Sequence, residues 1–167
     1  MIRTALSLAC LSLSTVAFAQ HPADGYYVTI DDETEAPKGL VELRVQDDGE
    51  LVGYLRGSFD PTSDMSGLCD TCEDELANQP VYGLPFVWGL EADGERKFKK
   101  GRVQDPEAGK TYKSKIKFNE DFTQAELRGY IGSPVLGRTQ VWRRATDADL
   151  ATINGHNANF GLDALPE

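Results

Sequence analysis

Histidine is scarce in this chain, with two residues among 167. His21 and His156 lie near opposite ends of the sequence, so a histidine base or a multi-histidine metal site has little to draw on. The chain also has no Gly-x-Ser-x-Gly motif and no phosphate-binding glycine loop ending in Lys-Ser or Lys-Thr. We therefore expect no enzyme, no catalytic residues, no metal and no cofactor. Carboxylate-pair catalysis stays open, because 27 Asp and Glu residues offer many pairs.

Basic residues are outnumbered, and long apolar runs are missing after the N-terminal segment. The chain has 17 Lys and Arg residues against 27 Asp and Glu, a formal net charge of −10. This acidic balance argues against nucleic acid and against anionic membrane surfaces as partners. No segment beyond residue 19 is long and apolar enough for a transmembrane helix. The sequence does not reveal an oligomeric state.

The first residues have the pattern of a secretory signal peptide, which we place at residues 1–19. Arg3 supplies the positive start, residues 5–16 form a short apolar run, and Ala17-Phe-Ala19 is a small-x-small cleavage site. Cys10 raises the alternative of a lipid-attachment site, which the very short apolar run before it disfavours. We expect an exported protein, either periplasmic or secreted.

Beyond this segment the dominant pattern is period-two alternation, broken by Gly, Asp and Pro about every ten residues. Asp48-Gly49 and Asp93-Gly94 indicate tight turns, because glycine accepts a positive φ. The alternation predicts eight strands, at residues 26–30, 40–46, 51–59, 85–90, 97–103, 111–118, 125–131 and 137–143.

The segment 112–118 shows the alternation most clearly. Lys113, Lys115 and Lys117 fall on one face, whereas Tyr112, Ser114, Ile116 and Phe118 fall on the other. A closed antiparallel barrel requires strands with one solvent-exposed face and one buried face. We therefore predict one all-β domain at residues 20–144, an eight-stranded antiparallel barrel.

The remaining residues, 145–167, are predicted to form a short helix or tail. Thr146 can cap a helix whose apolar face includes Leu150 and Ile153. The stretch 155–161 is too rich in Gly and Asn to continue that helix, so we expect a loosely held end.

Five motifs in a fixed order make the chain similar to a known family. They are GYYVTIDD (25–32), CDTC (69–72), GLPFVWGL (83–90), GRVQDPEAGKTY (101–112) and GYIGSPVLGRTQVW (129–142). The chain resembles exported bacterial proteins known only as domain of unknown function 2147. The resemblance implies a lipocalin-like β-barrel that binds a small apolar ligand, and it implies no reaction.

One departure from that family concerns the closed end of the barrel. The family, like the lipocalins, tends to open with Gly-x-Trp, whereas this chain has Gly25-Tyr26-Tyr27. A tyrosine there can still plug the end, with Arg143 or Arg144 packed over its ring.

Cys69 and Cys72 lie in a long loop at residues 60–80. A redox pair needs nearby positive charge, but there is no Lys, Arg or His between Arg56 and Arg96. A zinc site needs two more ligands, and none has recognisable spacing. We favour a structural disulfide, with the metal and redox interpretations left open.

Aromatic residues on the predicted strands are the candidate ligand-binding residues: Tyr54, Trp88, Tyr112, Tyr130 and Trp142. An eight-stranded barrel is either filled by side chains or just wide enough for one small ligand. Gly53, Gly57 and Gly129 remove side-chain volume, which favours a cavity. We expect a binding module for a small hydrophobic ligand, either apolar or amphipathic, with the 60–80 loop as a lid. The alternative is a structural or interaction protein of the cell envelope with a filled barrel and no ligand.

Overall fold

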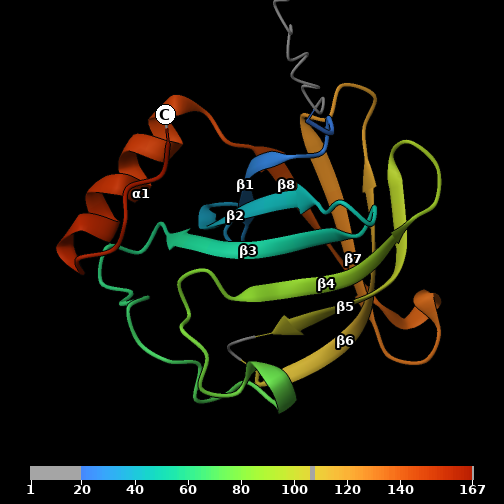
Figure 1. The fold of residues 1–167 in the computed structure, drawn as a ribbon, viewed down its shortest axis with the longest axis horizontal. Coiled ribbons are helices and arrows are strands. Elements are labelled where there is room, and N and C mark those ends of the chain that lie inside the picture. The colour runs from blue at the N-terminus through green and yellow to red at the C-terminus, as the bar shows by residue number, and fades with distance from the viewer. Residues whose placement is uncertain (1–19, 106–107, 167) are drawn as a thin grey trace, which may run out of the picture.

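The structure, a computed structural model, describes residues 20–105 and 108–166. In this part of the chain, eight strands form one closed antiparallel barrel (Figure 1). Each strand pairs with its sequence neighbours, and β8 closes the barrel on β1, with Trp142 opposite Thr29. The predicted fold class is confirmed. The strands are β1 (Gly25–Ile30), β2 (Pro37–Val45), β3 (Leu51–Ser58), β4 (Pro85–Ala92), β5 (Lys97–Asp105), β6 (Lys110–Phe118), β7 (Gln124–Tyr130) and β8 (Arg138–Arg144).

The expected signal peptide at residues 1–19, including Cys10, lies outside the described residues. Within the described ranges no helix has the length and apolarity needed to cross a membrane. Among the residues that the structure describes, three helical elements accompany the strands: the 3-10 helices η1 (Asp74–Leu76) and η2 (Pro134–Leu136), and the α-helix α1 (Asp147–Asn159).

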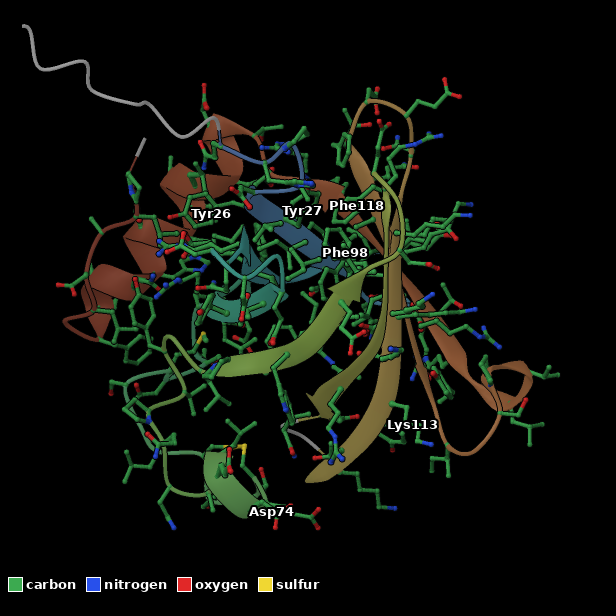
Figure 2. All side chains as sticks on the ribbon, turned by 45° about the vertical axis from the view of Figure 1, so that its right-hand side comes forward. Tyr26, Tyr27, Asp74, Phe98, Lys113 and Phe118 are labelled. Atoms are coloured by element: carbon green, nitrogen blue, oxygen red, sulfur yellow. A yellow bond between two sulfur atoms is a disulfide. The ribbon has the colours of Figure 1, made fainter. Side chains whose placement is uncertain are left out.

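The barrel interior is packed with large side chains. On β6, Ser114, Ile116 and Phe118 are buried, and the intervening lysines are exposed, as the alternation predicts. Figure 2 places Tyr27, Phe98 and Phe118 within the barrel and Lys113 on its outer side. Edge-to-face contacts join these rings, with centroids 5.9 Å apart for Tyr27–Phe118 and 6.2 Å for Phe98–Phe118. The interior is therefore an aromatic core at this end.

The expected tyrosine–arginine contact closes the same end. The guanidinium carbon of Arg144 lies 5.4 Å from the ring centroid of Tyr27, and its Nη1 donates to the Tyr27 hydroxyl at 3.1 Å. That hydroxyl donates in turn to the carbonyl of Phe122 at 3.1 Å. Burial raises the pKa of Tyr27, while Arg144 acts in the opposite direction. Tyr27 thus fills the place in which the resembled family tends to have tryptophan.

Strand glycines admit neighbouring side chains. A Cβ on Gly101 would lie 2.4 Å from Leu90 Cγ, and one on Gly57 would lie 2.3 Å from Ile153 Cγ2. A Cβ on Gly53 would meet Leu43 at 3.1 Å. Since packed side chains already fill these positions, Gly53 and Gly57 do not leave space for a ligand as the sequence suggested.

The C-terminal helix begins as predicted and lies against the outside of the barrel (Figure 1). Thr146 accepts a hydrogen bond from the Asp149 backbone, and the Asp149 carboxylate accepts one from the Thr146 backbone. Leu150 and Ile153 pack with Val28 and Leu40, which face outward from β1 and β2. An apolar patch on the outer barrel therefore holds α1 in place.

The predicted end of this helix was wrong, because α1 continues to Asn159 through the Gly- and Asn-rich stretch. Tertiary contacts override the weak helix propensity there. Asn157 is buried and donates to the Arg56 carbonyl at 3.0 Å, and the His156 ring bonds the Ser58 carbonyl at 3.1 Å. The last turns are thus tied to β3.

Candidate binding groove

The predicted disulfide is confirmed, since Cys69 and Cys72 are bonded. The surrounding segment is a small hairpin: the Cys69 N–H donates to the Gln79 carbonyl, and the Asn78 N–H donates to the Cys69 carbonyl, both at 2.9 Å. Both cysteines are buried and belong to the same apolar cluster as the barrel interior. The 60–80 loop is therefore anchored to the barrel.

The short helix η1 lies in this hairpin. The hairpin closely approaches Gly109, which precedes β6, because a Cβ on Gly109 would lie 2.6 Å from the carbonyl oxygen of Thr71. Glycine at this position, with φ of 64°, allows both the turn and the approach. The turn thus supports the hairpin that carries η1.

A groove of about 1010 Å³ runs along the outer face of β3, β4 and β5, with η1 as one wall. It extends from the β2–β3 turn to the beginning of β6. Its lining residues are Gln46, Asp48, Glu50, Val52, Tyr54, Glu73, Asp74, Glu75, Leu76, Pro85, Trp88, Arg102 and Thr111.

The apolar surface of the groove comes from outward positions of the strands. Tyr54 pairs in register with Glu42, an outward residue, and its hydroxyl accepts from Gln46 Nε2 at 3.5 Å. Trp88 lies opposite Arg102 on the neighbouring strand. Both aromatic side chains are half-buried. Half-buried aromatic rings offer an apolar face to a ligand at little conformational cost.

The charge around the groove is predominantly negative. Five carboxylates line it, and Arg102 is the one cationic side chain in its lining. Glu50 is bonded to β4, because its Oε1 accepts a hydrogen bond from the Gly89 backbone N–H at 2.6 Å. Glu73, Asp74 and Glu75 are exposed, and Figure 2 shows Asp74 at the outer edge of this wall. The arrangement suits a molecule with an apolar body and a cationic group.

The structure separates the five candidate ligand-binding residues. Tyr54 and Trp88 line the same groove. Tyr112 lies opposite Val103 and shares the inward face of β6, and Trp142 is fully buried, with its ring centroid 6.1 Å from that of Phe86. Tyr130 lies opposite Lys113 on the outer face, beyond the groove.

Sequence reasoning assigned these aromatics to one interior and missed the outward lining. The available signal was strand parity: in β3, Tyr54 alternates with Leu51, Gly53 and Leu55 and shares its parity with Arg56. The contribution of η1 had no local signal, because it depends on where the hairpin folds.

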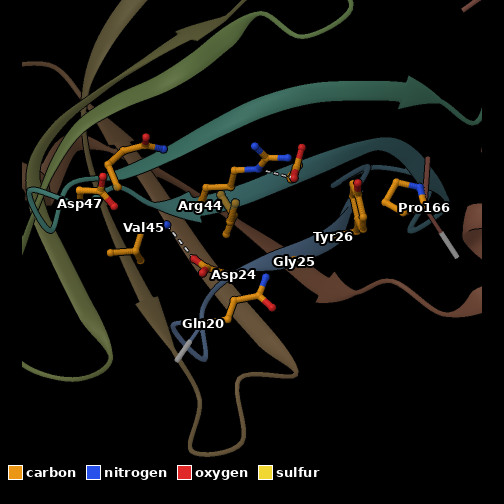
Figure 3. Close-up of a pocket in the computed structure, with 11 residues that line it drawn as sticks. Gln20, Asp24, Gly25, Tyr26, Arg44, Val45, Asp47 and Pro166 are labelled. Carbon is orange, nitrogen blue, oxygen red and sulfur yellow. Dashed lines mark hydrogen bonds and ion pairs between the residues drawn. The ribbon is translucent and has the colours of Figure 1, made fainter. Parts of the chain in front are cut away.

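A second hollow of about 410 Å³ lies near the start of β1 (Figure 3). Its polar groups already bind one another. Asp24 Oδ1 accepts from the Val45 backbone at 2.7 Å, and Glu42 accepts from Arg44 at 2.5 Å and from Arg56 at 2.7 Å. Burial and the neighbouring Glu42 raise the pKa of the hollow's Tyr26. These internal bonds leave the larger groove as the better candidate site.

Both histidine rings have backbone hydrogen-bond partners. The His21 ring accepts from the Ala23 backbone, and the His156 ring bonds β3. In residues 20–105 and 108–166, no group of three or more His, Cys, Asp or Glu side chains is arranged to hold a metal ion.

A closed eight-stranded barrel, plugged by Tyr27 and Arg144 and flanked by a C-terminal helix, defines a lipocalin-like protein. A solved structure described as protein HP1028 from Helicobacter pylori, which "belongs to the lipocalin family", is similar to this chain, with a TM-score of 0.63. The two share 22% identity over 87% of this chain and 92% of the other. At this identity the likeness shows the fold alone.

The sequence profile of the family described as "Uncharacterized protein conserved in bacteria (DUF2147)" matches residues 25–144. The chain belongs to this family, which confirms the resemblance seen in the motifs. No curated protein matches its sequence.

Proposed function

We propose that this protein is an exported binding protein that holds a small amphipathic molecule in the outer groove, with the ligand's charged end cationic. The observation that carries the proposal is the pairing of Tyr54 and Trp88 with a wall of carboxylates in one hollow of about 1010 Å³. The aromatic rings would bind the apolar body, and the exposed carboxylates of η1 would attract the cationic group.

The anchored hairpin supports this placement. Its disulfide and its backbone bonds to Gln79 and Asn78 fix the shape of the hairpin, and both cysteines pack in the apolar cluster of the barrel. A preformed wall lowers the entropy lost on binding. In this proposal the 60–80 loop serves as a fixed side of the site instead of a lid over the barrel interior.

Titration calorimetry with dodecyltrimethylammonium below its micelle concentration tests the groove. We expect Trp88→Ala to weaken binding by roughly tenfold or more, the loss typical of a truncated aromatic anchor. Val141→Ala is the matched control, because it truncates an exposed apolar side chain (44%) on the outer face of β8, away from the groove, and should leave affinity unchanged. The binding that Trp88→Ala removes should be weaker for dodecyl sulfate than for the cation. Equal affinity of Trp88→Ala and the unmodified protein would refute this site.

Export is tested separately by fractionation. The segment 1–19 predicts that periplasmic or secreted material starts at Gln20. Mass spectrometry of that material under native conditions would also reveal a co-purifying small molecule. Protein retained in the cytoplasm with Met1 in place would contradict export.

The packed interior favours a second function, that of a cell-envelope interaction protein without a small ligand. Tyr27, Phe98, Phe118 and Trp142 are buried where many lipocalin-like barrels would need space for a ligand. Absence of binding to any cationic or neutral amphiphile, together with a co-purifying protein, would support this alternative.

A further inference from the structure

The loop between β7 and β8 exposes three aliphatic side chains. Ile131 is 68% exposed, Val135 is 83% and Leu136 is 81%. Val135 and Leu136 lie in η2, which projects from the barrel at the lower right of Figure 1. Exposed aliphatic side chains grouped at one loop tip usually mark a contact surface.

The shape of this loop is held by Arg128 on β7. Its guanidinium donates to the carbonyl of Pro134 at 2.6 Å, to the carbonyl of Val135 at 3.2 Å and to the hydroxyl of Thr139 at 2.7 Å. Gly137 follows closely over β7, since a Cβ there would lie 2.4 Å from the Gly129 carbonyl. The loop thus folds back on the outer face of β7 while its apolar side chains point to solvent.

A cationic strip lies beside the loop on the same outer face. Lys113, Lys115 and Lys117 point outward from β6, and Lys115 stands opposite Arg128, the residue that holds the loop. Glu126 lies opposite Lys117 on this face, but within residues 20–105 and 108–166 no ion pair joins the three lysines to a carboxylate. A strip of one sign is notable on a chain whose net charge is −10.

An aromatic ring stands between the strip and the loop. Tyr130 precedes the loop and lies opposite Lys113. Tyrosines concentrate at the level of lipid headgroups, where their apolar ring and polar hydroxyl are both accommodated.

We propose that this face docks the protein on an anionic lipid bilayer. Val135 and Leu136 enter the interface, Tyr130 lies at headgroup level, and Lys113, Lys115 and Lys117 contact anionic headgroups. The surface is a narrow convex tip, whereas a stable protein interface buries about 800 Å² per partner in a complementary patch. Charge complementarity and this convex shape favour a lipid surface over a second protein.

The net charge of the chain argued against anionic membranes, but that reasoning averages over the molecule. Attraction to a charged surface falls off within about 8 Å at physiological ionic strength. The lysine strip is therefore what a nearby bilayer meets, and the carboxylates around the groove lie in the β2–β3 turn and in the 60–80 loop.

Co-sedimentation of the purified protein with vesicles tests the proposal. We expect binding to phosphatidylcholine vesicles that contain phosphatidylglycerol, little binding to pure phosphatidylcholine, and loss of binding at high salt. Each lysine near the surface contributes about a fivefold change in partitioning, so Lys113→Gln with Lys115→Gln, the two lysines beside the loop, should weaken binding about 25-fold. Val135→Ser with Leu136→Ser should abolish it.

Leu68→Ser is the matched control, because Leu68 is an exposed aliphatic residue (58%) in the 60–80 loop. It should bind vesicles like the unmodified protein. In a separate variant, Leu136→Trp should show a blue-shifted fluorescence component on anionic vesicles.

Three results would overturn the proposal. One is equal vesicle binding by the Val135→Ser, Leu136→Ser variant, and another is no binding to either vesicle. The third is a vesicle-independent dimer or protein complex that the same variant abolishes, which would assign the face to a protein partner. Near-ultraviolet circular dichroism confirms that each variant is folded.

Discussion

The contact between Gly57 and Ile153 decides how α1 sits on the barrel, and it can be tested by a double-mutant cycle. A Cβ on Gly57 would lie 2.3 Å from Ile153 Cγ2, well inside van der Waals contact. Gly57 does not have a positive φ, so the cost of Gly57→Ala is steric. Overpacking of this kind costs about 2 kcal/mol. Ile153→Ala, at a fully buried side chain, should cost about 3 kcal/mol.

The two costs should not add. In the double variant the new methyl group occupies space that the isoleucine has left, so we expect a total near 3 kcal/mol where independent effects would give about 5 kcal/mol. The difference is a coupling of about 2 kcal/mol.

Urea unfolding followed by circular dichroism measures all four free energies. Gly155→Ala is the control on the same helix: nothing lies within 4 Å of its Cβ position, and alanine should stabilise α1 by up to about 1 kcal/mol. Additive costs for Gly57→Ala and Ile153→Ala would refute the inference that α1 packs into the space over Gly57.

Three further predictions concern stability. The Asp149 carboxylate caps α1 and accepts two hydrogen bonds from the guanidinium of Arg143, and these bonds lower its pKa. Asp149→Asn should therefore lower the free energy of unfolding by about 2 kcal/mol at neutral pH. Because a lowered pKa stabilises the folded state above the unfolded value and is lost on acidification, this difference should shrink below about pH 4, and a pH-independent difference would contradict it. Cys69→Ser and Cys72→Ser should each leave a folded barrel that is about 2 kcal/mol less stable, with faster proteolysis of the 60–80 loop; loss of the whole fold on circular dichroism would contradict this. Tyr27→Phe removes the hydroxyl bonds to Arg144 and Phe122 and should lower the free energy of unfolding in urea by about 1 to 2 kcal/mol. An unchanged free energy of unfolding would show that the ring alone closes this end.

Much of the barrel could be predicted because strand formation leaves a local record. The lysines of β6 alternate with buried residues, and Gly49 and Gly94 do adopt the positive φ that their turns require. Each of these signals is complete within a few residues. The same holds for the beginning of α1, where Thr146 and Asp149 cap the helix within a single turn.

The groove and the docking face depend on contacts between distant segments. Tyr54 and Trp88 are 34 positions apart in the sequence. The sequence shows that each is aromatic, but it does not show that both lie on the same face of the closed sheet. Their common lining with η1 follows from register and from the fold of the hairpin, both of which are long-range properties.

The sequence by itself determined the alternating strands, the tight turns and the family, because each is recorded in neighbouring residues or in a recognisable motif. Only the tertiary structure decided that aromatic side chains fill one end of the interior, that α1 extends to Asn159, and that lysines and aliphatic side chains share one outer face. The physical reason is that packing and strand register join residues far apart in the chain, and no local pattern records the side of the barrel on which they meet.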